Sequence, residues 1–319
     1  MLPADLRCPE TRFFASAPGR TAMPDEIIST LDRPDRASAP SASAIGTILL
    51  HVQNDRSLGD RLESALSLAR ACTAHIHCVH VTPVEAFMAF DAFGGVFVMN
   101  DVVRALDEDE TKLRERIERE LANEDVTWDY EKVTGGVAPQ LVRHGALADI
   151  IVTGRVDHGG TAIPLNSAAI GDILHQSRTP LFLPANGGGA VDPFGHALIA
   201  WDGSSEASNA VRASLGLLSL ASSVQVIQIS EEGKQGEFPS TRLLEYLSRH
   251  SIHAELRVET ASTSRGDAVA DLLLAHARET KAAYLVMGGY AHSRIGQYLF
   301  GGVTRSLLDH SELPLVIGR

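Results

Sequence analysis

The strongest constraint on the fold is an internal repeat. The segment Asp-Ile-Ile-Val-Thr-Gly at 149–154 matches Ala-Tyr-Leu-Val-Met-Gly at 283–288, and residues 178–184 match 312–318. Gly154 and Gly288 are 134 residues apart, as are Pro180 and Pro314, and a third pair of segments opens at Gly136 and Gly266. A nearly constant spacing across separate segments indicates two copies of one supersecondary unit.

Each copy alternates apolar, strand-like runs with amphipathic, helix-like runs. In the second copy we expect strands at 196–201, 224–230, 253–259, 284–288 and 315–317, and helices at 205–220, 241–250 and 268–280. Strands separated by helices form a mainly parallel sheet that is covered on both faces. The predicted fold class is therefore α/β, with two tandem doubly wound, Rossmann-like domains of about five strands each.

Composition predicts the domain boundaries. Residues 1–44 are rich in Pro, Ser and Ala and have no periodicity, so this tail is expected to be disordered. The first domain spans 45–185, the Gly-rich segment 186–195 is a flexible linker, and the second domain spans 196–319.

Charge and hydropathy argue against several classes of function. The net charge of −12 and the lack of a basic stripe do not suit a nucleic-acid partner. No apolar run is as long as a membrane span. Cys8, Cys72 and Cys78 are too few for a disulfide framework and favour a reducing compartment. We therefore expect a cytoplasmic protein that binds neither nucleic acid nor membrane.

Residues 284–319 predict a buried strand, a glycine-bearing loop, a helix and a final strand. Glycine lets the backbone approach an anion, and a helix start offers free N–H groups, so this arrangement favours phosphate. The segment resembles the C-terminal signature of the universal stress protein family, G-x2-G-x9-G-[ST]. Gly288 and Gly301 take the first and third glycine positions, and Val303 and Thr304 continue the match. Ala291 stands at the second glycine, and Gly302 stands where Ser or Thr is usual.

The resemblance covers residues 45–185 and 196–319 and is strongest in the second copy. It implies a tandem family member whose two domains pack as an intramolecular pseudo-dimer, with a homodimer as a further expectation. It also implies an adenine nucleotide, ATP, ADP or AMP, with Mg²⁺ accompanying ATP. Protein partners are not identified by the sequence.

Asp202 and Gly203 close the first strand of the second copy. A carboxylate there can accept hydrogen bonds from an adenine amino group or a ribose hydroxyl, and the resemblance implies that role. It also places the backbone of Ile229 against the adenine. His292 and Arg294 lie in the loop and add positive charge near a phosphate. The predicted nucleotide-binding residues are Asp202, Gly203, Ile229, Gly288, Ala291, His292, Arg294, Gly301, Gly302, Val303 and Thr304.

The first copy lacks most of this pattern. Its first strand continues into Gln53-Asn54-Asp55, with no Asp at the matching place. Asp157 stands at the second glycine position, where a carboxylate would repel phosphate, and Pro164 restricts the loop. Ser167-Ala168 replace the final Gly-Ser. We expect this copy to be structural or to bind a different ligand.

Three other segments carry weaker signals. Cys72–His80 holds five residues of metal-binding type, but a strand would turn neighbouring ligands to opposite faces, so no metal site is expected. The apolar segment 87–97 is expected to be a loop that packs as a flap on the companion domain; the alternative is an exposed patch for a protein partner or a lipid-like ligand. The charged run 107–120 predicts a solvated helix face with i,i+4 ion pairs.

These patterns favour a non-enzymatic, nucleotide-responsive binding or scaffold protein of the stress response. No nucleophile elbow or P-loop motif is present, and no catalytic residue is predicted. Two alternatives remain open. One is a ligand-free protein-interaction module with both sites degenerate, and the other is a weak ATPase.

Overall fold

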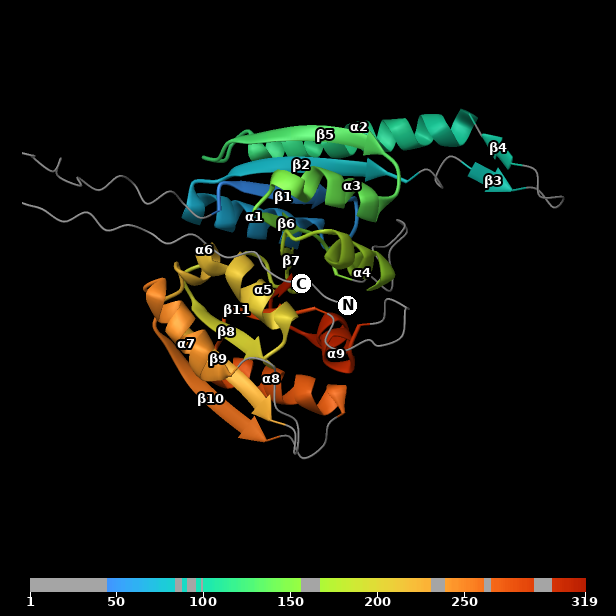
Figure 1. Ribbon diagram of the computed structural model, residues 1–319. Helices are drawn as coiled ribbons and strands as arrows, with labels where there is room; N and C mark the ends of the chain where they lie inside the picture. The colour runs from blue at the N-terminus through green and yellow to red at the C-terminus, as the bar shows by residue number, and fades with distance from the viewer. Residues whose placement is uncertain are drawn as a thin grey trace, which may run out of the picture. The chain divides into compact units, whose positions relative to one another are not determined.

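A computed structural model describes residues 45–83, 88–90, 96–98, 100–155, 167–230, 239–260, 265–289 and 300–319 (Figure 1). The predicted disordered tail, residues 1–44, lies outside the described residues. No helix in the described ranges is long and apolar enough to cross a membrane.

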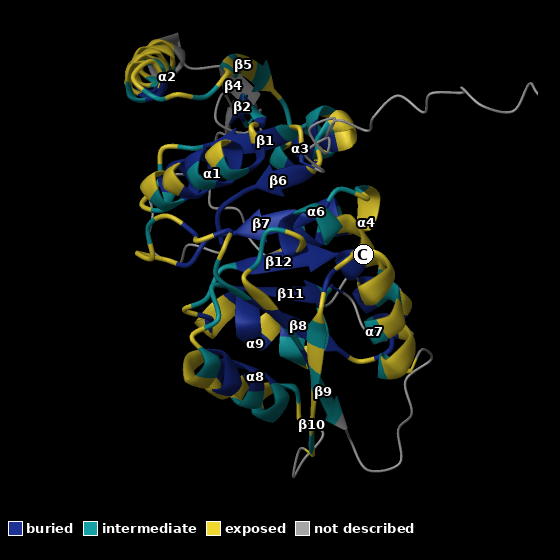
Figure 2. Cartoon of the chain, turned by 90° about the vertical axis from the view of Figure 1, so that its left-hand side faces the viewer, coloured by how far each residue is buried: buried dark blue, intermediate teal, exposed yellow. Residues whose placement is uncertain are grey.

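The structure is built on one ten-stranded sheet with the order β10-β9-β8-β11-β12-β7-β6-β1-β2-β5 (Figure 2). Its strands are β1 (Thr47–Val52), β2 (His75–Thr82), β5 (Trp128–Thr134), β6 (Ile150–Val152), β7 (Leu181–Leu183), β8 (His196–Trp201), β9 (Ser223–Ser230), β10 (Ala254–Thr260), β11 (Tyr284–Gly288) and β12 (Leu315–Gly318). All neighbouring strands are parallel except β7 and β12. The predicted α/β class with a mainly parallel sheet is confirmed.

The repeat in the sequence reappears as a repeat in strand order. Numbered along the chain within each half, the five strands of both halves lie in the order 3-2-1-4-5. The two groups of five form one sheet because β7 and β12 pair antiparallel, with Phe182 opposite Val316. The two predicted domains therefore share a continuous hydrogen-bonded sheet rather than holding two separate ones.

Helices cover both faces of the sheet. They are α1 (Leu58–Cys72), α2 (Asn100–Leu121), α3 (Val137–His144), α4 (Ser167–Gln176), α5 (Ser205–Ala213), α6 (Leu215–Leu218), α7 (Ser240–Arg249), α8 (Gly266–Thr280) and α9 (Gly302–His310), with a 3₁₀ turn η2 at Gly145–Leu147. One buried apolar cluster gathers residues of α1, α2, α5, α6 and α7, and the other gathers residues of α3, α4, α8 and α9. Corresponding helices of the two halves therefore share a face of the sheet.

Arg155, which follows β6, fastens the first half to the second. Its buried guanidinium donates to the carbonyl of Pro184 at 2.8 Å and to the carbonyls of Ser311 and Leu313 in the second half. Burial lowers the pKa of Arg155 to about 10. The repeat places Gly289 at the equivalent position, and there a Cβ would come within 3.1 Å of Leu174. The contact between the halves is therefore not symmetric at the level of side chains.

Three local predictions can be compared with the structure. The charged run lies on α2 and carries the predicted i,i+4 pairs, Arg114–Glu118 at 2.6 Å and Arg116–Glu120 at 2.8 Å. The single helix expected at 205–220 is wrong, because Ser214 has φ −100° and ψ 6° and separates α5 from α6. The loop expected at 87–97 contains two short antiparallel strands, β3 (Met88–Phe90) and β4 (Val96–Val98).

Candidate functional site

The predicted nucleotide site lies at the switch point of the second half. From β8 the chain proceeds to β9 and β10 on one side, and to β11 and β12 on the other. In doubly wound sheets, ligands bind in the crevice beyond the carboxyl ends of the two strands where this reversal occurs. Asp202 follows the end of β8, and Gly288 ends β11. Ile229 lies one residue beyond Gln228, the partner of the last β8 residue, and so is level with Asp202.

A tight turn fixes the carboxylate of Asp202. Its Oδ1 accepts hydrogen bonds from the Ser204 backbone N–H at 2.9 Å and from the Ser204 hydroxyl at 2.6 Å. Gly203 between them has φ +73°, which a side chain would disfavour. Ser204 in turn caps α5 by accepting from the N–H of Ala207 at 3.1 Å. Asp202 is exposed, and no cation pairs with it among the described residues.

Gly288 allows the end of β11 to lie against the first turn of α5. A Cβ on Gly288 would come within 2.6 Å of the Ala207 nitrogen and 2.8 Å of the Glu206 carbonyl carbon. Because both contacts are with backbone, no side-chain rotation could relieve them. Packing therefore explains this glycine without reference to a ligand.

The start of α9 forms the other wall of the predicted site. Since α9 carries the chain from the end of β11 back to β12, which runs parallel to β11, its first turn lies at the edge where Asp202 lies. Gly301 caps this helix, Gly302 and Val303 begin it, and Thr304 is buried in it.

The first residue of α9, Gly302, lies against Gly266, the first residue of α8. A Cβ on Gly266 would come within 2.4 Å of the Gly302 carbonyl carbon, and a Cβ on Gly302 would lie 3.1 Å from the Gly266 Cα. The two helices approach here backbone to backbone. A glycine at 302, where the predicted motif has Ser or Thr, therefore has a packing explanation.

Sequence comparison identifies this half of the chain. A model of the universal stress protein family matches residues 193–319. The second half is a universal stress protein domain. The comparison with curated proteins found no match.

Solved structures extend the similarity to most of the chain. A universal stress protein from Archaeoglobus fulgidus DSM 4304 is 15% identical, with a TM-score of 0.64 over 87% of this chain and 97% of that chain. A structure from Pseudomonas aeruginosa UCBPP-PA14, also described as a universal stress protein, is 16% identical, with a TM-score of 0.53 over 86% of this chain and 94% of that chain. A shorter universal stress protein solved in complex with cAMP matches at 16% identity and a TM-score of 0.28, over 45% of this chain and 99% of that chain. The first two similarities show that both halves share the fold of universal stress proteins.

The equivalent crevice of the first half, beyond β1 and β6, is filled by an arginine. Arg61 is fully buried, and its Nη1 lies 3.0 Å from both carboxylate oxygens of Asp55, while its Nη2 donates to the Gln53 carbonyl at 2.8 Å. A Cβ on Gly154, the repeat partner of Gly288, would come within 2.6 Å of Arg61 Nη1. Burial lowers the pKa of Arg61, although the charge and hydrogen bonds of Asp55 act in the opposite direction.

The structure corrects one prediction about this first-half crevice. Asp55 occupies the same position in its turn as Asp202, since its Oδ1 accepts hydrogen bonds from the Ser57 N–H at 3.0 Å and from the Ser57 hydroxyl at 3.1 Å. The comparison of the two repeats missed Asp55 because it comes three residues after the end of β1, whereas Asp202 follows β8 directly. The shared Asp-x-Ser before a helix was the signal that could have identified it.

Further polar side chains close the first crevice. His51 is buried, and its Nδ1 lies 3.0 Å from the Thr153 hydroxyl. Burial, together with the positive charges of Arg61 and His80, holds its pKa well below the usual value. His80 bonds the Val52 carbonyl through Nδ1 at 2.9 Å and Glu110 through Nε2 at 3.2 Å. Most polar groups of the first crevice therefore bond to one another or to the backbone, although the buried Arg61 Nε has no hydrogen-bond partner among the described residues.

Several predicted residues lie outside the described part of the chain. These are Ala291, His292 and Arg294 of the second half, and Asp157 and Pro164 of the first. The described residues of the predicted site therefore include the carboxylate and the strand ends but not the middle of the glycine loop.

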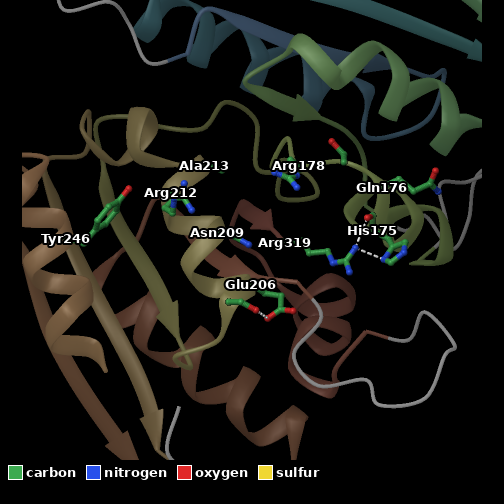
Figure 3. A pocket seen from close by; sticks show the side chains of 11 residues that line it. His175, Gln176, Arg178, Glu206, Asn209, Arg212, Ala213, Tyr246 and Arg319 are labelled. Carbon is green, nitrogen blue, oxygen red and sulfur yellow. Dashed lines mark hydrogen bonds between the residues drawn. The ribbon is translucent and has the colours of Figure 1, made fainter. Parts of the chain in front are cut away.

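A separate hollow of about 870 Å³ lies beside α5 (Figure 3). Its lining includes Arg178, Arg212 and Arg319, and Arg319 donates to the His175 carbonyl at 2.6 Å. Asp202 and Gly288 do not line it. This basic hollow is therefore distinct from the predicted nucleotide site, although both include residues next to the first turn of α5.

Proposed function

We propose that this chain is a non-enzymatic stress-response protein of the cytoplasm whose second half binds an adenine nucleotide. The ligand would stabilise only the conformation that completes the glycine loop predicted from the sequence, and so act as a switch for a binding or scaffold role. The family of the second half supports the general role, and the geometry beyond β8 and β11 supports the ligand.

The observation that carries the proposal is the exposed Asp202 carboxylate at the switch point. Its Oδ1 is held by Ser204, and its orientation is therefore fixed before any ligand arrives. The second oxygen is available to accept a hydrogen bond from a ribose hydroxyl or an adenine amino group. The equivalent carboxylate in the first half, Asp55, is instead neutralised by Arg61.

The phosphates are assigned to the start of α9. The first turn of this nine-residue helix has N–H groups without partners within the helix, and its dipole favours an anion. His292 and Arg294, from the loop that precedes α9, are proposed to add positive charge. The ligand classes are ATP with Mg²⁺, ADP or AMP.

One observation favours the alternative of a ligand-free interaction module. Gly302 lacks a phosphate-binding hydroxyl, and its close approach to Gly266 explains the glycine by packing alone. In that case the second half keeps its fold without a ligand and serves protein partners.

Thermal melting with and without Mg²⁺-ATP distinguishes the two. A ligand at one hundred times its dissociation constant adds about 2.7 kcal/mol to the free energy of unfolding. Asp202→Asn keeps an oxygen for the Ser204 turn but removes the charge, so the shift in melting temperature should shrink markedly while the unliganded melting temperature stays nearly constant.

Asp192→Asn is the matched control. Asp192 accepts from the Phe194 N–H at 3.0 Å in a similar turn, but it precedes β8 and so lies at the opposite edge of the sheet. This variant should keep the full ATP shift. An equal shift in Asp202→Asn would contradict the placement of the site, and no shift in the unmodified protein would support the interaction module. Turnover of Mg²⁺-ATP would reveal an ATPase.

A further inference from the structure

A cluster of metal-ligand residues lies in the first half, away from the crevice. His77 of β2, Glu131 of β5 and His144, the last residue of α3, each offer one ligand atom within 4.8 Å of the other two. His77 Nε2 lies 3.5 Å from Glu131 Oε2, and His144 Nδ1 lies 3.3 Å from the same oxygen. Three separate elements therefore converge on one point.

The two separations from Glu131 suit a tetrahedral ion. Zinc binds nitrogen and carboxylate oxygen at about 2.0–2.2 Å, which places two ligand atoms of a tetrahedron about 3.3–3.6 Å apart. The side chains of His77 and His144 are 19% and 14% exposed, and that of Glu131 is 48% exposed. The cluster is therefore held by packing on one side and open to an ion from solvent on the other.

A second carboxylate orients one of the imidazoles. Asp129 Oδ1 lies 2.7 Å from His77 Nδ1, so that Nε2 faces Glu131. His75 approaches the same Asp129 oxygen at 3.3 Å and thereby helps to fix it. A carboxylate bonded to the far nitrogen of a histidine is the usual outer support of a metal ligand, because it sets the tautomer and the ring direction.

We propose that His77, Glu131 and His144 bind a transition-metal dication of the Zn²⁺ class, with water in the fourth position. Two imidazoles and one carboxylate match the ligands that Zn²⁺ prefers, whereas Mg²⁺ and Ca²⁺ prefer oxygen ligands alone. The strand alternation that argued against Cys72–His80 as a site is respected. His77 uses partners from elsewhere in the chain, and Cys78 is buried.

The second half provides an internal comparison. His77 pairs in register with Leu49 and Asp129, and the equivalent Gln225 pairs with Leu198 and Glu255. Two residues further along the edge strands, Glu131 corresponds to Arg257. The second half therefore has an amide and a cation where the first has two ligands, and His276 of α8 bonds Gln225 there at 2.5 Å.

The test is a titration of the chelator-treated full chain with Co²⁺ and then Zn²⁺. Co²⁺ should give the visible absorption of tetrahedral nitrogen and oxygen coordination, and calorimetry should show one strong Zn²⁺ site per chain. His77→Gln copies the residue of the second half and should raise the Zn²⁺ dissociation constant at least about 100-fold. Asp129→Ala, which removes only the outer support, should raise it about 10–100-fold.

His253→Gln is the matched control, because His253 is exposed and directly precedes the edge strand β10. It should leave the Zn²⁺ affinity unchanged. His144→Gln at the end of α3 provides a second ligand variant if His77→Gln fails to fold. Octahedral Co²⁺ spectra, or equal Zn²⁺ affinity in the unmodified protein and both ligand variants, would show that the cluster is an ion-pair network alone and overturn the proposal.

Discussion

The crevices of the two halves have the same strand order and the same Asp-x-Ser turn, but differ in what faces the aspartate. In the first half, Arg61 fills the space and pairs with Asp55 at 3.0 Å. In the second half, Ser208 occupies the equivalent place, four residues after the turn serine, and its hydroxyl bonds back to the Ser204 carbonyl at 2.9 Å. The carboxylate of Asp202 is therefore left exposed.

The comparison teaches that one fold can hold the same turn aspartate either paired with an internal arginine or exposed. An arginine in place of the serine gives the carboxylate a positively charged hydrogen-bond donor. Without the arginine, the carboxylate accepts hydrogen bonds from solvent or from the donor groups of a ligand. Neighbouring side chains then become buried, as His51 and Thr153 are. The same strand framework holds a buried arginine–aspartate pair in one half and an exposed aspartate in the other.

The largest expected effect comes from removing the buried cation. Arg61→Met should lower the free energy of unfolding by about 3–5 kcal/mol, because it leaves the largely buried Asp55 carboxylate without its partner. Urea unfolding measures this loss. Ser208→Ala at the equivalent position should cost no more than about 1.5 kcal/mol, the value of one hydrogen bond.

A double variant makes this prediction sharper. Adding Asp55→Asn to Arg61→Met removes the unpaired charge and should recover part of the loss, since the two residues are directly coupled. Equal free energies of unfolding for the Arg61→Met and Ser208→Ala proteins would show that the Arg61–Asp55 pair does not stabilise the first half.

The second prediction compares the glycines at the starts of corresponding helices. Gly266→Ala should cost about 1–3 kcal/mol, because its Cβ would come within 2.4 Å of the Gly302 backbone. Gly136→Ala should cost less than about 1 kcal/mol, since its Cβ would meet only the Pro139 ring at 3.3 Å. Thermal melting of the two variants tests the difference, and similar losses would show that the α8–α9 crossing is not tightly packed.

The third and smallest effect concerns pH. The pKa of His51 is lowered in the folded protein, so below about pH 6.5 the unfolded chain binds a proton that the folded chain does not. Unfolding free energy should therefore fall on acidification, with up to about 1.4 kcal/mol per pH unit due to His51. Ala200 occupies the matching place in β8, so the second half has no histidine there, although burial also lowers the pKa of its His196.

His51→Gln isolates this contribution. Denaturant unfolding at several pH values between 7 and 5 should give a shallower decline for the variant than for the unmodified protein. Parallel declines would indicate that His51 titrates normally and that the first crevice admits water.

The sequence predicted the fold well because the repeat and the buried strands are local signals. The constant spacing between Gly154 and Gly288 located the same strand in both halves, and the structure places them at equivalent positions. The pairing of β7 with β12 was not predictable in the same way, since periodicity shows that a strand is buried but not which strand lies beside it.

The candidate site was only partly predictable. Asp202 was located by its place after a strand, but Asp55 was missed because a longer loop shifts it by two residues. Gly302 was judged as a departure from a phosphate-binding motif, whereas its contact with Gly266 is visible only once α8 and α9 are packed. The cluster of His77, Glu131 and His144 depends on strand register and helix placement, which spacing along the chain does not give.

The antiparallel pairing of β7 and β12 has a consequence for how the two halves could diverge. In an assembly of two identical chains, each substitution appears in both copies, so an arginine that closes one crevice closes the other. Here both partners belong to one chain, and Arg61 coexists with Ser208. The association is also intramolecular and does not weaken on dilution. Joining the two copies in one chain therefore allows equivalent positions to carry different residues, which identical subunits cannot do.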